Sequence, residues 1–368
     1  MSTVVALSGG VDSSVAAWLL AEAGHDLIGV SMQLWDARAH GGAESRCCSA
    51  ADFRDARHVA GRAGFPYYVL DYEEVFQARV VEPFARDYRE GRTPNPCVEC
   101  NRHLKFGALL ETAERLGAER LATGHYARVD DDPASGRRRL RRARDLDKDQ
   151  SYFLYGLGQA ALERVVFPLG GLLKEEVREL ARLAGLRVAD KPESQDLCFL
   201  AGGSRITLLA PHGQNGPGAC GDVVTSAGRR LGAHRGLALY TVGQRRGLGD
   251  LPGGPWYVVR LESEANRVVV GRESEQYADG LEASQVNWTA GERPRRPFEA
   301  RVRIRHAHQP AEASVEPVGA DAARVRFREP QRAVTPGQAA VFYDDDVLVG
   351  GGRIERAESG LTPSLPAA

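Results

Sequence analysis

Short apolar runs alternate with amphipathic segments over about the first 200 residues, and this alternation constrains the fold more than any other feature. "VVALS" (4–8) and "LIGVSMQLW" (27–35) have the composition of buried strands. Segments 15–24 and 51–64 have helical periodicity and end at a glycine. "YYVLDY" and "RLATGHYA" (120–127) are further strand candidates. Such a chain is expected to form an α/β fold, a parallel sheet covered by helices, that binds ligands beyond the carboxyl ends of its strands.

The segment "NRHLKFGALLETAERLG" predicts an amphipathic helix that begins near Asn101. Its expected apolar face consists of Leu104, Leu109, Leu110, Ala113 and Leu116.

After about residue 205 the chain changes to short strands punctuated by glycine and proline. The segment 256–271 predicts two strands around a turn, and 299–305, 323–328 and 339–351 alternate in the β manner. In the two arginine-rich strands the apolar residues fall on one face and the arginines on the other, which predicts a cationic rim. We therefore expect an α/β domain at 1–204, a small β-rich domain at 205–278, a terminal β-barrel at 279–358 and a frayed tail at 359–368.

The composition is that of an ordinary globular protein, with 43% hydrophobic and 26% charged residues. The start of the chain has no basic leader, and no apolar run approaches the length that spans a bilayer, so we expect a cytoplasmic protein without a membrane partner. The six cysteines are too sparse for a secreted disulfide scaffold. A net charge of −1 gives no global reason to expect nucleic acid, although 137–144 and 292–306 each hold six arginines. Solvated surface is the simplest interpretation of either run alone.

"LSGGVDSS" (7–14) directly follows the first expected strand and leads into the first helix. Its two glycines allow a sharp turn with bare N–H groups, and Ser13 and Ser14 lie where the unpaired donors of the helix begin, so the loop can hold a phosphate. It is neither a Walker A loop nor a dinucleotide fingerprint. A tight Gly-Gly turn with a serine cap is the structural alternative.

Ser-Gly-Gly-x-Asp-Ser resembles the pyrophosphate loop of the ATP-pyrophosphatase (PP-loop) superfamily, whose members adenylate a substrate oxygen. Eight stretches, in matching order, further resemble the tRNA-specific 2-thiouridylase family: "GVSMQLW", "GRTPNPCVECNRHLKFG", "LATGHYAR", "DKDQSYFLY", "KPESQDLCFL", "YTVGQRRGLG", "WYVV" and "TPGQAAVFY". This resemblance implies an ATP-dependent transferase that sulfurates the wobble uridine of tRNA at C2.

The resemblance also implies the residues of the nucleotide site, where ATP would bind with Mg²⁺ and Asp12 would help to hold the metal. The expected ATP-binding residues are Ala6, Leu7, Ser8, Gly9, Gly10, Val11, Asp12, Ser13, Met32 and Gly124. Gly124 would let the ligand approach the backbone, whereas Met32 is equally well explained as core filling.

For tRNA, the resemblance nominates seven residues: His125, Lys148, Asp149, Gln150, Arg305, His306 and Gln338. Arg305 has independent support because it ends one of the arginine-faced strands, and cations spaced along a strand can follow a phosphate backbone. The run at 137–144 would supply a second phosphate contact. His125 is alternatively a satisfied core histidine. The target uridine must leave its stack to reach a thiol, so base extrusion is expected.

Two cysteines are expected to carry the sulfur chemistry. Cys100 comes just before the helix expected from Asn101, where the helix dipole would lower its thiol pKa. Cys198 lies in a loop between Pro192 and Gly202. By resemblance, Cys198 would hold the transferable sulfur as a persulfide and Cys100 would act as the second cysteine.

Cys97 forms a Cys-x-x-Cys pair with Cys100 that leaves two interpretations open. Zinc normally needs four ligands, and no complementary pair occurs elsewhere in the chain. Cys97 either lines the target-base pocket with Asn95 and Pro96, or joins Cys100 and Cys198 in holding a four-iron four-sulfur cluster. We favour the persulfide interpretation. Cys47 and Cys48 are expected to pack, and Cys220 is given no role.

The leading hypothesis is therefore ATP-dependent tRNA 2-thiolation, supplied with sulfur by a relay protein or a cysteine desulfurase. One alternative is a small-molecule adenylating ligase of the same superfamily, which explains the phosphate loop but not the cysteines. The other is an RNA-binding module with a dead nucleotide fold, which predicts tRNA binding without product.

Overall fold

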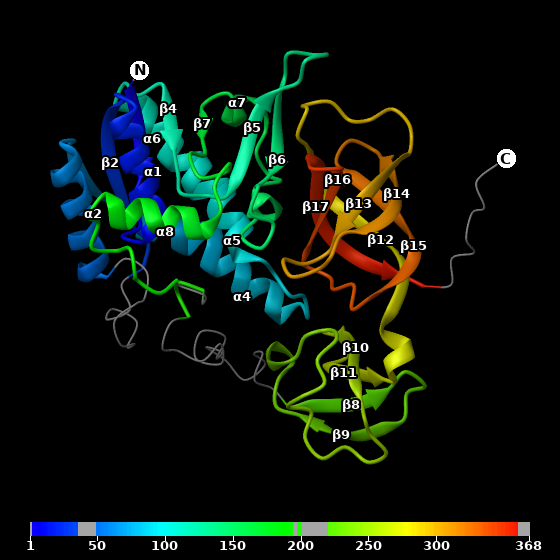
Figure 1. Ribbon diagram of the computed structural model, residues 1–368. Coiled ribbons are helices and arrows are strands. Elements are labelled where there is room, and N and C mark those ends of the chain that lie inside the picture. Colours follow the sequence, from blue (N-terminus) through cyan, green and yellow to red (C-terminus); the bar gives the residue numbers. More distant parts are fainter. Residues whose placement is uncertain (1, 36–48, 194–196, 201–219, 360–368) are drawn as a thin grey trace.

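The computed structural model describes residues 2–35, 49–193, 197–200 and 220–359, and it divides them among three sheets. Figure 1 shows an α/β unit beside a β-barrel, with a smaller sheet below both. The expected fold class, a parallel-sheet domain followed by a small β-rich domain and a β-barrel, is confirmed. Cys47, Cys48 and most of the expected tail lie outside the described residues.

The first unit is built on a five-stranded parallel sheet with the strand order β3-β2-β1-β4-β7. Val4 and Val5 of the central strand are fully buried, as expected for a sheet that is covered on both faces. The strands are β1 (Ser2–Ala6), β2 (Asp26–Gln33), β3 (Tyr67–Asp71), β4 (Arg120–Ala122) and β7 (Val165–Val166).

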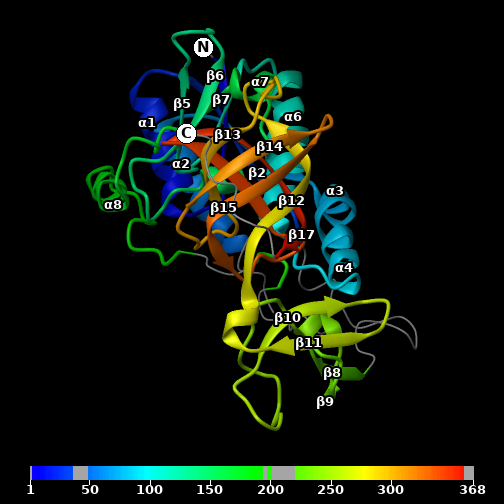
Figure 2. The same cartoon turned by 90° about the vertical axis from the view of Figure 1, so that its right-hand side faces the viewer.

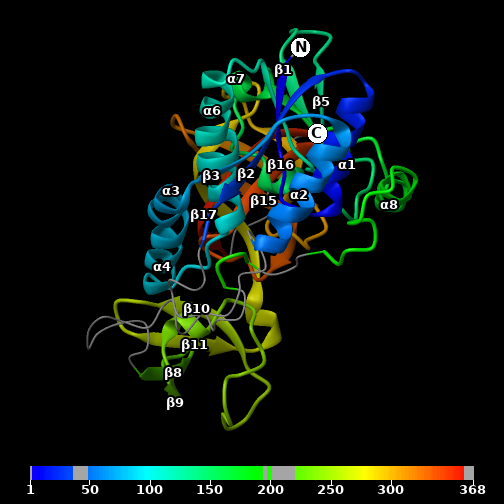
Figure 3. The same ribbon diagram turned by 90° about the vertical axis from the view of Figure 1, so that its left-hand side faces the viewer.

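Helices cover both faces of this sheet, as Figure 3 shows, with α1, α2 and α8 on one side and α3, α4 and α6 on the other. Helix α2 is fixed at both ends, by a capping box between Ser49 and Asp52 and by Gly64 in the left-handed region. The helices are α1 (Val11–Glu22), α2 (Ala50–Ala63), α3 (Glu73–Phe76), α4 (Glu82–Arg89), α5 (Pro96–Glu99), α6 (Leu109–Arg115), α7 (Gln159–Leu162) and α8 (Lys174–Leu183).

A wide π-helical stretch, Cys100–Ala108, joins α5 and α6 into one continuous helix, and Gln77–Val81 joins α3 and α4 in the same way. The helix begins at Pro96, which occupies the first-turn position that proline favours, so the expected start near Asn101 is wrong. Four of the five residues expected on its apolar face are buried, but Leu116 is 43% exposed because it follows the last helical turn.

The terminal unit is a closed six-stranded antiparallel barrel, completed by pairing of β12 with β17 (Figure 2). Val302, Ile304, Val325 and Phe327 point into its core, as their alternation with arginine predicts. Its strands are β12 (Tyr277–Trp288), β13 (Phe298–Arg303), β14 (Ala311–Val318), β15 (Ala322–Arg332), β16 (Ala339–Asp344) and β17 (Val347–Glu358).

A hairpin of the first unit extends this barrel sheet, an arrangement that the sequence did not predict. The strands β5 (Ala127–Asp131) and β6 (Arg138–Arg142) pair with each other, and β6 continues the sheet from β17. The expected strand at 120–127 is therefore two elements, because β4 ends at Ala122 and β5 begins at Ala127 in the other sheet.

The small unit is a four-stranded sheet with the order β10-β11-β8-β9. Val258, Val268 and Trp256 lie in its own hydrophobic cluster. Its strands are β8 (Gly221–Thr225), β9 (Arg230–His234), β10 (Tyr257–Glu262) and β11 (Arg267–Gly271). Across the described segments, no helix is both long and apolar enough to span a bilayer.

Candidate functional site

The phosphate loop lies between β1 and α1, at the carboxyl edge of the parallel sheet. The Ser13 hydroxyl accepts a hydrogen bond from the Ser8 N–H at 3.1 Å and donates one to the Gly10 carbonyl at 3.2 Å, which closes the loop on itself. Gly9 has φ +72°, and a Cβ there would lie 2.4 Å from the Asp52 carbonyl oxygen, so no other residue fits. Gly10 caps α1 without a side-chain bond, which leaves the end of the helix open towards a ligand.

Asp12 lies in the first turn of α1 and is held by two neighbours that the sequence did not single out. Lys174 Nζ donates to both oxygens of its carboxylate, at 2.7 and 2.8 Å. The Tyr126 hydroxyl donates to Asp12 Oδ1 at 2.8 Å, and burial together with the Asp12 charge raises the pKa of Tyr126 well above its usual value. These contacts fix the carboxylate beside the loop, where it could ligate a magnesium ion that accompanies a nucleotide.

A second lysine, Lys191, fastens the other side of the loop. Its ammonium donates to the Gly9 carbonyl at 2.9 Å, to Asp52 Oδ1 at 2.9 Å and to Asp55 Oδ2 at 2.6 Å. Burial lowers the pKa of Lys191, but these hydrogen bonds and carboxylates raise it more, so the group remains a cation. Lys191 belongs to the quoted "KPESQDLCFL" stretch, whereas Lys174 stands in no motif that could have signalled it.

A cavity of about 250 Å³ opens beside the phosphate loop. Its lining includes most of the expected nucleotide residues together with two residues expected on the RNA side, and its members are Ala6, Leu7, Ser8, Asp12, Ser13, Val30, Met32, Leu34, Phe53, Lys105, Thr123, Gly124, His125 and Gln150. The structure thus brings Met32 and Gly124 to the phosphate loop, and it places His125 and Gln150 there as well.

Gly124 lines the cavity, and the packing of the fold gives a further reason for its lack of a side chain. A Cβ at this position would lie 2.6 Å from the Ser13 backbone nitrogen and 2.8 Å from the Asp12 carbonyl carbon. The residue therefore allows the segment after β4 to pack directly on the first turn of α1, which fixes the phosphate loop.

His125 is buried in the wall of this cavity and is packed between the rings of Phe106 and Phe167. Its Nδ1 lies 2.6 Å from Thr123 Oγ1, and its Nε2 lies 3.4 Å from Lys105 Nζ. Burial, with a further contribution from the Lys105 charge, lowers the pKa of His125 well below its usual value. The imidazole is therefore neutral, accepts from the lysine at Nε2 and carries its proton on Nδ1.

Cys100 and Cys198 are both half-buried and pack against the same hydrophobic cluster, although they are far apart in sequence. Phe199 anchors the second of these residues in that cluster, with ring centroids 5.1 Å from Phe84, 5.7 Å from Phe76 and 6.4 Å from Trp35. The two predicted sulfur residues are thus brought to one region of the fold.

The position of Cys100 in its helix differs from the expectation. It lies beyond the first turn, at the start of the π-helical stretch, whereas the exposed Cys97 lies in the first turn itself. The helix dipole acts mainly within the first turn, so the argument for a lowered thiol pKa does not apply to Cys100. Nor do the described residues contain a group of three His, Cys, Asp or Glu side chains that could hold a metal ion, so Cys97, Cys100 and Cys198 do not form a ready cluster site.

The segment that holds Asn95 and Pro96 is fixed by the barrel through the "TPGQ" turn. Gln338 Nε2 donates to the Thr93 carbonyl at 2.8 Å, and the Thr93 N–H donates to the Pro336 carbonyl at 2.9 Å. Gly337 has φ +92°, and a Cβ there would lie 2.9 Å from the Thr93 nitrogen. Two quoted motifs far apart in the sequence therefore meet, and Gln338 uses its amide to position the predicted target-base segment.

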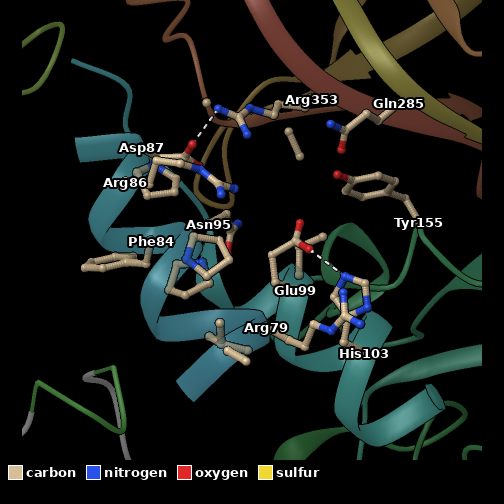
Figure 4. Close-up of a pocket in the computed structure, with 18 residues that line it drawn as sticks. Arg79, Phe84, Arg86, Asp87, Asn95, Glu99, His103, Tyr155, Gln285 and Arg353 are labelled. Carbon is tan, nitrogen blue, oxygen red and sulfur yellow. Dashed lines mark hydrogen bonds and ion pairs between the residues drawn. The ribbon is translucent and has the colours of Figure 1, made fainter. Parts of the chain in front are cut away.

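Asn95 and Pro96 also line a cavity of about 300 Å³ between α4, α5 and the barrel (Figure 4). In this cavity Arg353 Nη2 donates to Asp87 Oδ1 at 2.8 Å, and His103 Nε2 lies 3.2 Å from Glu99 Oε2. Cys97 is not among its lining residues.

Asp149 is buried between the first unit and the barrel. Its carboxylate accepts from Arg142 Nε and Arg303 Nη1, each at 3.1 Å, and from the Ser151 hydroxyl at 3.0 Å. Arg303 also lies over the ring of Tyr152 at 5.5 Å. The side chain of Asp149 is fully enclosed, so it holds the two units together rather than facing a ligand.

The other members of the predicted RNA set are partly accessible. Lys148 pairs with Glu193 at 2.8 Å near the nucleotide side. Arg305 donates to the Arg332 carbonyl at 3.0 Å, and burial together with the Arg332 charge lowers its pKa. His306 is exposed and stacks on Phe153, with ring centroids 4.7 Å apart.

The arginines of the 137–144 run are already paired within the protein. Each contacts at least one carboxylate, and the partners are Glu292 for Arg137, Asp131 for Arg138, Asp130 for Arg139, Asp130 and Asp346 for Arg141, Asp149 for Arg142 and Glu176 for Arg144. The run therefore serves the hairpin and its junction with the barrel, which argues against the expected second phosphate contact.

Comparison with known proteins agrees with this three-part architecture. The family model "tRNA methyl transferase HUP domain" matches residues 1–202, "tRNA methyl transferase PRC-barrel domain" matches 212–272, and "Aminomethyltransferase beta-barrel domain" matches 278–354. A solved 4-thiouridine synthetase–RNA complex with bound ATP aligns over 55% of this chain and 45% of that chain with 18% identity and a TM-score of 0.34, which is too distant to carry an argument.

The alignments with two closely similar relatives cover nearly the whole length of both proteins. The tRNA-specific 2-thiouridylase MnmA of Koribacter versatilis is 48% identical over 361 residues, covering 95% of this chain and 98% of its own length. The protein of the same name from Carboxydothermus hydrogenoformans is 49% identical over 357 residues, covering 96% of this chain and 97% of its own length. Because such relatives match nearly all of the sequence, the chain belongs to the tRNA-specific 2-thiouridylase family.

Proposed function

We propose that this protein catalyses ATP-dependent 2-thiolation of the wobble uridine of tRNA in the cytoplasm, with Cys198 as the sulfur carrier and Cys100 as its partner. The observation that carries the proposal is the packing of both cysteines against one hydrophobic cluster, in the same unit as a phosphate loop. A small-molecule ligase of the same superfamily needs the loop but has no use for this pair.

The proposed reaction begins at the phosphate loop. The C2 oxygen of the uridine attacks the α-phosphorus of ATP, pyrophosphate leaves, and the base carries an adenylate at C2. Main-chain N–H groups at the start of α1 would bind the phosphates. Asp12 would hold the magnesium ion that neutralises their charge.

Sulfur transfer then uses both cysteines. The terminal sulfur of the Cys198 persulfide attacks C2, and AMP leaves. The Cys100 thiolate attacks the inner sulfur of Cys198, the sulfur–sulfur bond to the base breaks, and 2-thiouridine is released while a Cys100–Cys198 disulfide forms. A reductant must open this disulfide, and a sulfur-relay protein or cysteine desulfurase must reload Cys198, before the next cycle.

For RNA we propose a division of roles within the predicted set. Arg305, His306 and Lys148 are accessible at least in part and would contact tRNA directly. Asn95 and Pro96, which line the cavity beside the barrel, would surround the extruded base, with the exposed Cys97 next to them. Asp149 and Gln338 would not touch tRNA but would hold other groups in position. The side chain of Asp149 is enclosed, and Gln338 donates a hydrogen bond to the Thr93 carbonyl.

His125 and Gln150 line the nucleotide cavity, so we assign them to the nucleotide side. The segment 1–204 would thus perform the chemistry, 279–358 would bind tRNA and 205–278 would connect them.

The test is formation of 2-thiouridine by variants of the cysteines. Cys100→Ser and Cys198→Ser should each reduce the product to background, whereas Cys220→Ser, altered at an exposed cysteine of the small unit, should match the wild type. Wild-type product from both of the first two variants would end the thiol mechanism. ATP consumption should depend on tRNA, since turnover without RNA is the behaviour of a small-molecule ligase.

Cys97→Ser separates the persulfide from the iron–sulfur alternative. The persulfide mechanism does not use this thiol, so the variant should retain most of the activity. A cluster held by three cysteines would lose a ligand, and both activity and bound iron, measured after anaerobic purification, would disappear. The exposure of Cys97 and the lack of a three-ligand group among the described side chains support the first outcome.

A further inference from the structure

The small unit carries a loop that the proposed function leaves unexplained. This loop is the "YTVGQRRGLG" stretch (240–249), which contains the adjacent arginines Arg245 and Arg246. Both side chains are exposed, and neither guanidinium has a hydrogen bond or an ion pair within the described part of the chain. In the same sheet Arg230 pairs with Asp222 and Arg260 pairs with Glu262. The two loop arginines are therefore set apart as cations that an anionic partner can reach.

The backbone of the loop is held in one shape by Gln244. The Thr241 N–H donates to Gln244 Oε1 at 3.0 Å, and Gln244 Nε2 donates to the Arg246 carbonyl at 2.8 Å. The Gly243 N–H donates to the Val258 carbonyl at 2.8 Å, and the Val258 N–H donates to the Gln244 carbonyl at 2.9 Å, which joins the loop to β10. A loop that is ordered before its partner arrives loses less conformational entropy on binding.

The loop also packs against the barrel. Gly243 has φ +87°, and a Cβ there would lie 2.8 Å from the Ala333 Cβ, so a side chain at this position would push the loop away from the barrel. The Ala333 N–H donates to the Gln276 carbonyl at 2.8 Å, and Arg332 Nε donates to Gln276 Oε1 at 3.2 Å. The guanidinium of Arg332 lies 5.5 Å from the centre of the Tyr257 ring. The loop is thereby fixed next to Arg332, the last residue of β15.

Arginines of the small unit and of the barrel meet at this contact. The Arg332 carbonyl accepts from Arg305 Nη1 at 3.0 Å, so Arg332 connects the loop to the predicted RNA contact Arg305. Among the described residues, none of Arg245, Arg246, Arg305 and Arg332 pairs with a carboxylate, in contrast to the arginines of the 137–144 run. Like charges that are gathered without a counter-charge repel one another, and an anionic ligand would offset this repulsion.

We propose that the loop 240–249 is a second RNA-binding element, in which Arg245 and Arg246 bind the sugar–phosphate backbone of tRNA beside Arg305 and Arg332. This inference rests on the proposed function, since it takes tRNA as the substrate, and it makes the small unit a binding element as well as a connection. Guanidinium groups can hold a phosphate through two donors, and such contacts position an RNA without reading its sequence. Gln244 is the positioning residue, because it shapes the loop without carrying charge.

RNA fits this surface better than an acidic protein does. His306 is exposed directly after Arg305, and its ring stacks on Phe153 with the ring centroids 4.7 Å apart, so it offers a flat face to an unstacked base. The cations follow one another from the loop through Arg332 to Arg305, and the phosphates of an RNA strand repeat along such a path.

The experiment measures the Kd of an unmodified tRNA transcript with a wobble uridine over a series of potassium chloride concentrations. The double variant Arg245→Ala, Arg246→Ala should raise the Kd about tenfold near physiological salt. It should also reduce the slope of log Kd against log salt by about 2, because each lost phosphate contact removes about 1. In the thiolation assay the KM for tRNA should rise while kcat at saturating tRNA stays unchanged.

Three further variants separate charge, position and loop shape. Arg229→Ala alters an exposed arginine in the turn before β9, the strand farthest from the barrel (Figure 1), and it should keep the wild-type Kd and slope. The double variant Arg245→Lys, Arg246→Lys keeps both charges and should retain most of the slope. Gln244→Ala keeps the arginines but loosens their loop, so the Kd should rise about threefold with an unchanged slope.

Wild-type affinity and slope in the Arg245→Ala, Arg246→Ala protein would overturn the inference, and so would an equal loss in Arg229→Ala. The inference also falls if the double variant binds tRNA normally but has a raised KM for a cysteine desulfurase used as the sulfur donor, since the loop would then bind a protein. In each case the wild type still forms 2-thiouridine, and the proposed function survives. A wild-type protein that neither binds tRNA nor forms product overturns both proposals together.

Discussion

The nucleotide side and the barrel side of this molecule use their motif residues differently. On the nucleotide side, residues of "LSGGVDSS", "GVSMQLW" and "LATGHYAR" line one cavity beside a phosphate loop. On the barrel side, Gln338 of "TPGQ" bonds the backbone of another motif, and Asp149 of "DKDQSYFLY" is enclosed between two arginines. A motif match therefore predicts which residues matter, but it does not tell whether a side chain faces a ligand or another part of the protein.

The difference has a physical origin in how the units are joined. The nucleotide site lies within one sheet and its helices, so neighbouring loops at one edge converge on it. The barrel has to be docked onto that unit, and a buried charge at such a junction is tolerated only when it is paired and hydrogen-bonded. Asp149 satisfies this condition with Arg142, Arg303 and Ser151.

Removal of the Asp149 carboxylate is the most severe test of this comparison. Asp149→Ala leaves two guanidinium groups at the junction without their shared partner, and loss of one member of a buried ion pair typically costs about 3–5 kcal/mol. The free energy of unfolding of the first unit and barrel, measured by urea denaturation, should fall by an amount on this scale.

A matched control lies on the neighbouring strand β13, where Arg301 is exposed. Arg301→Ala should change the unfolding free energy by less than about 0.5 kcal/mol. If instead Asp149→Ala keeps full stability and only tRNA binding is lost, Asp149 faces RNA and the distinction between the two sides is wrong.

The "TPGQ" turn gives the next largest effect. Gly337→Ala forces an alanine into a left-handed conformation and brings its Cβ to 2.9–3.0 Å from the Thr93 backbone, so it should destabilise the junction by about 2–3 kcal/mol. Gly319→Ala has the same backbone penalty, with φ +59°, but no atom lies within 4 Å, and it should cost only about 1 kcal/mol. Equal urea midpoints for the two variants would show that the contact with Thr93 contributes nothing.

Gly337→Ala should also reduce formation of 2-thiouridine at temperatures where the protein remains folded, because it displaces the segment of Asn95 and Pro96. A fully active Gly337→Ala protein would mean that the barrel does not position this segment.

The sequence predicted elements that depend on local patterns of residues, but it did not predict contacts between residues that are distant in the chain. The alternation of apolar runs was enough for the parallel sheet, and the arginine–valine alternation was enough for two strands of the barrel. The β5–β6 hairpin was not predicted because its arginines look like solvated surface, whereas each is neutralised by a carboxylate that is adjacent only in space. Lys174 was not found for the same reason. It stands in no motif, and its partners Asp12 and Glu193 are distant from it in the chain.

The helix that carries Cys100 shows a further limit of sequence reasoning. Hydrophobic periodicity identified its buried face but not its start, because the residues from Pro96 to Cys100 precede the periodic pattern. A five-residue shift in the start changed which cysteine lies at the helix terminus. The resemblance to a family identified both cysteines regardless, since it depends on residue types rather than on helix boundaries.

The smallest expected effect concerns His125, which the sequence assigned to RNA and the structure places in the wall of the nucleotide cavity. Burial keeps its folded-state pKa well below the usual 6.5, so the imidazole stays neutral in the native protein. The unfolded chain takes up a proton below about pH 6.5, and the native state does not, so the stability contributed by His125 is complete above that pH and is lost as the pH falls. The loss should be about 1 kcal/mol at pH 5.5.

His125→Gln removes this titration while keeping a polar group beside Thr123 and Lys105. The variant should lose less unfolding free energy than the wild type between pH 7.5 and 5.5, by about the same 1 kcal/mol. His234, His306 and His308 also have pKa values lowered by burial, so both proteins should still lose stability in acid, and only the difference between them reports on His125. An identical pH dependence in the two proteins would mean that His125 is accessible to solvent, as a residue on the RNA side would be. His125 would then belong to the RNA side and not to the nucleotide side.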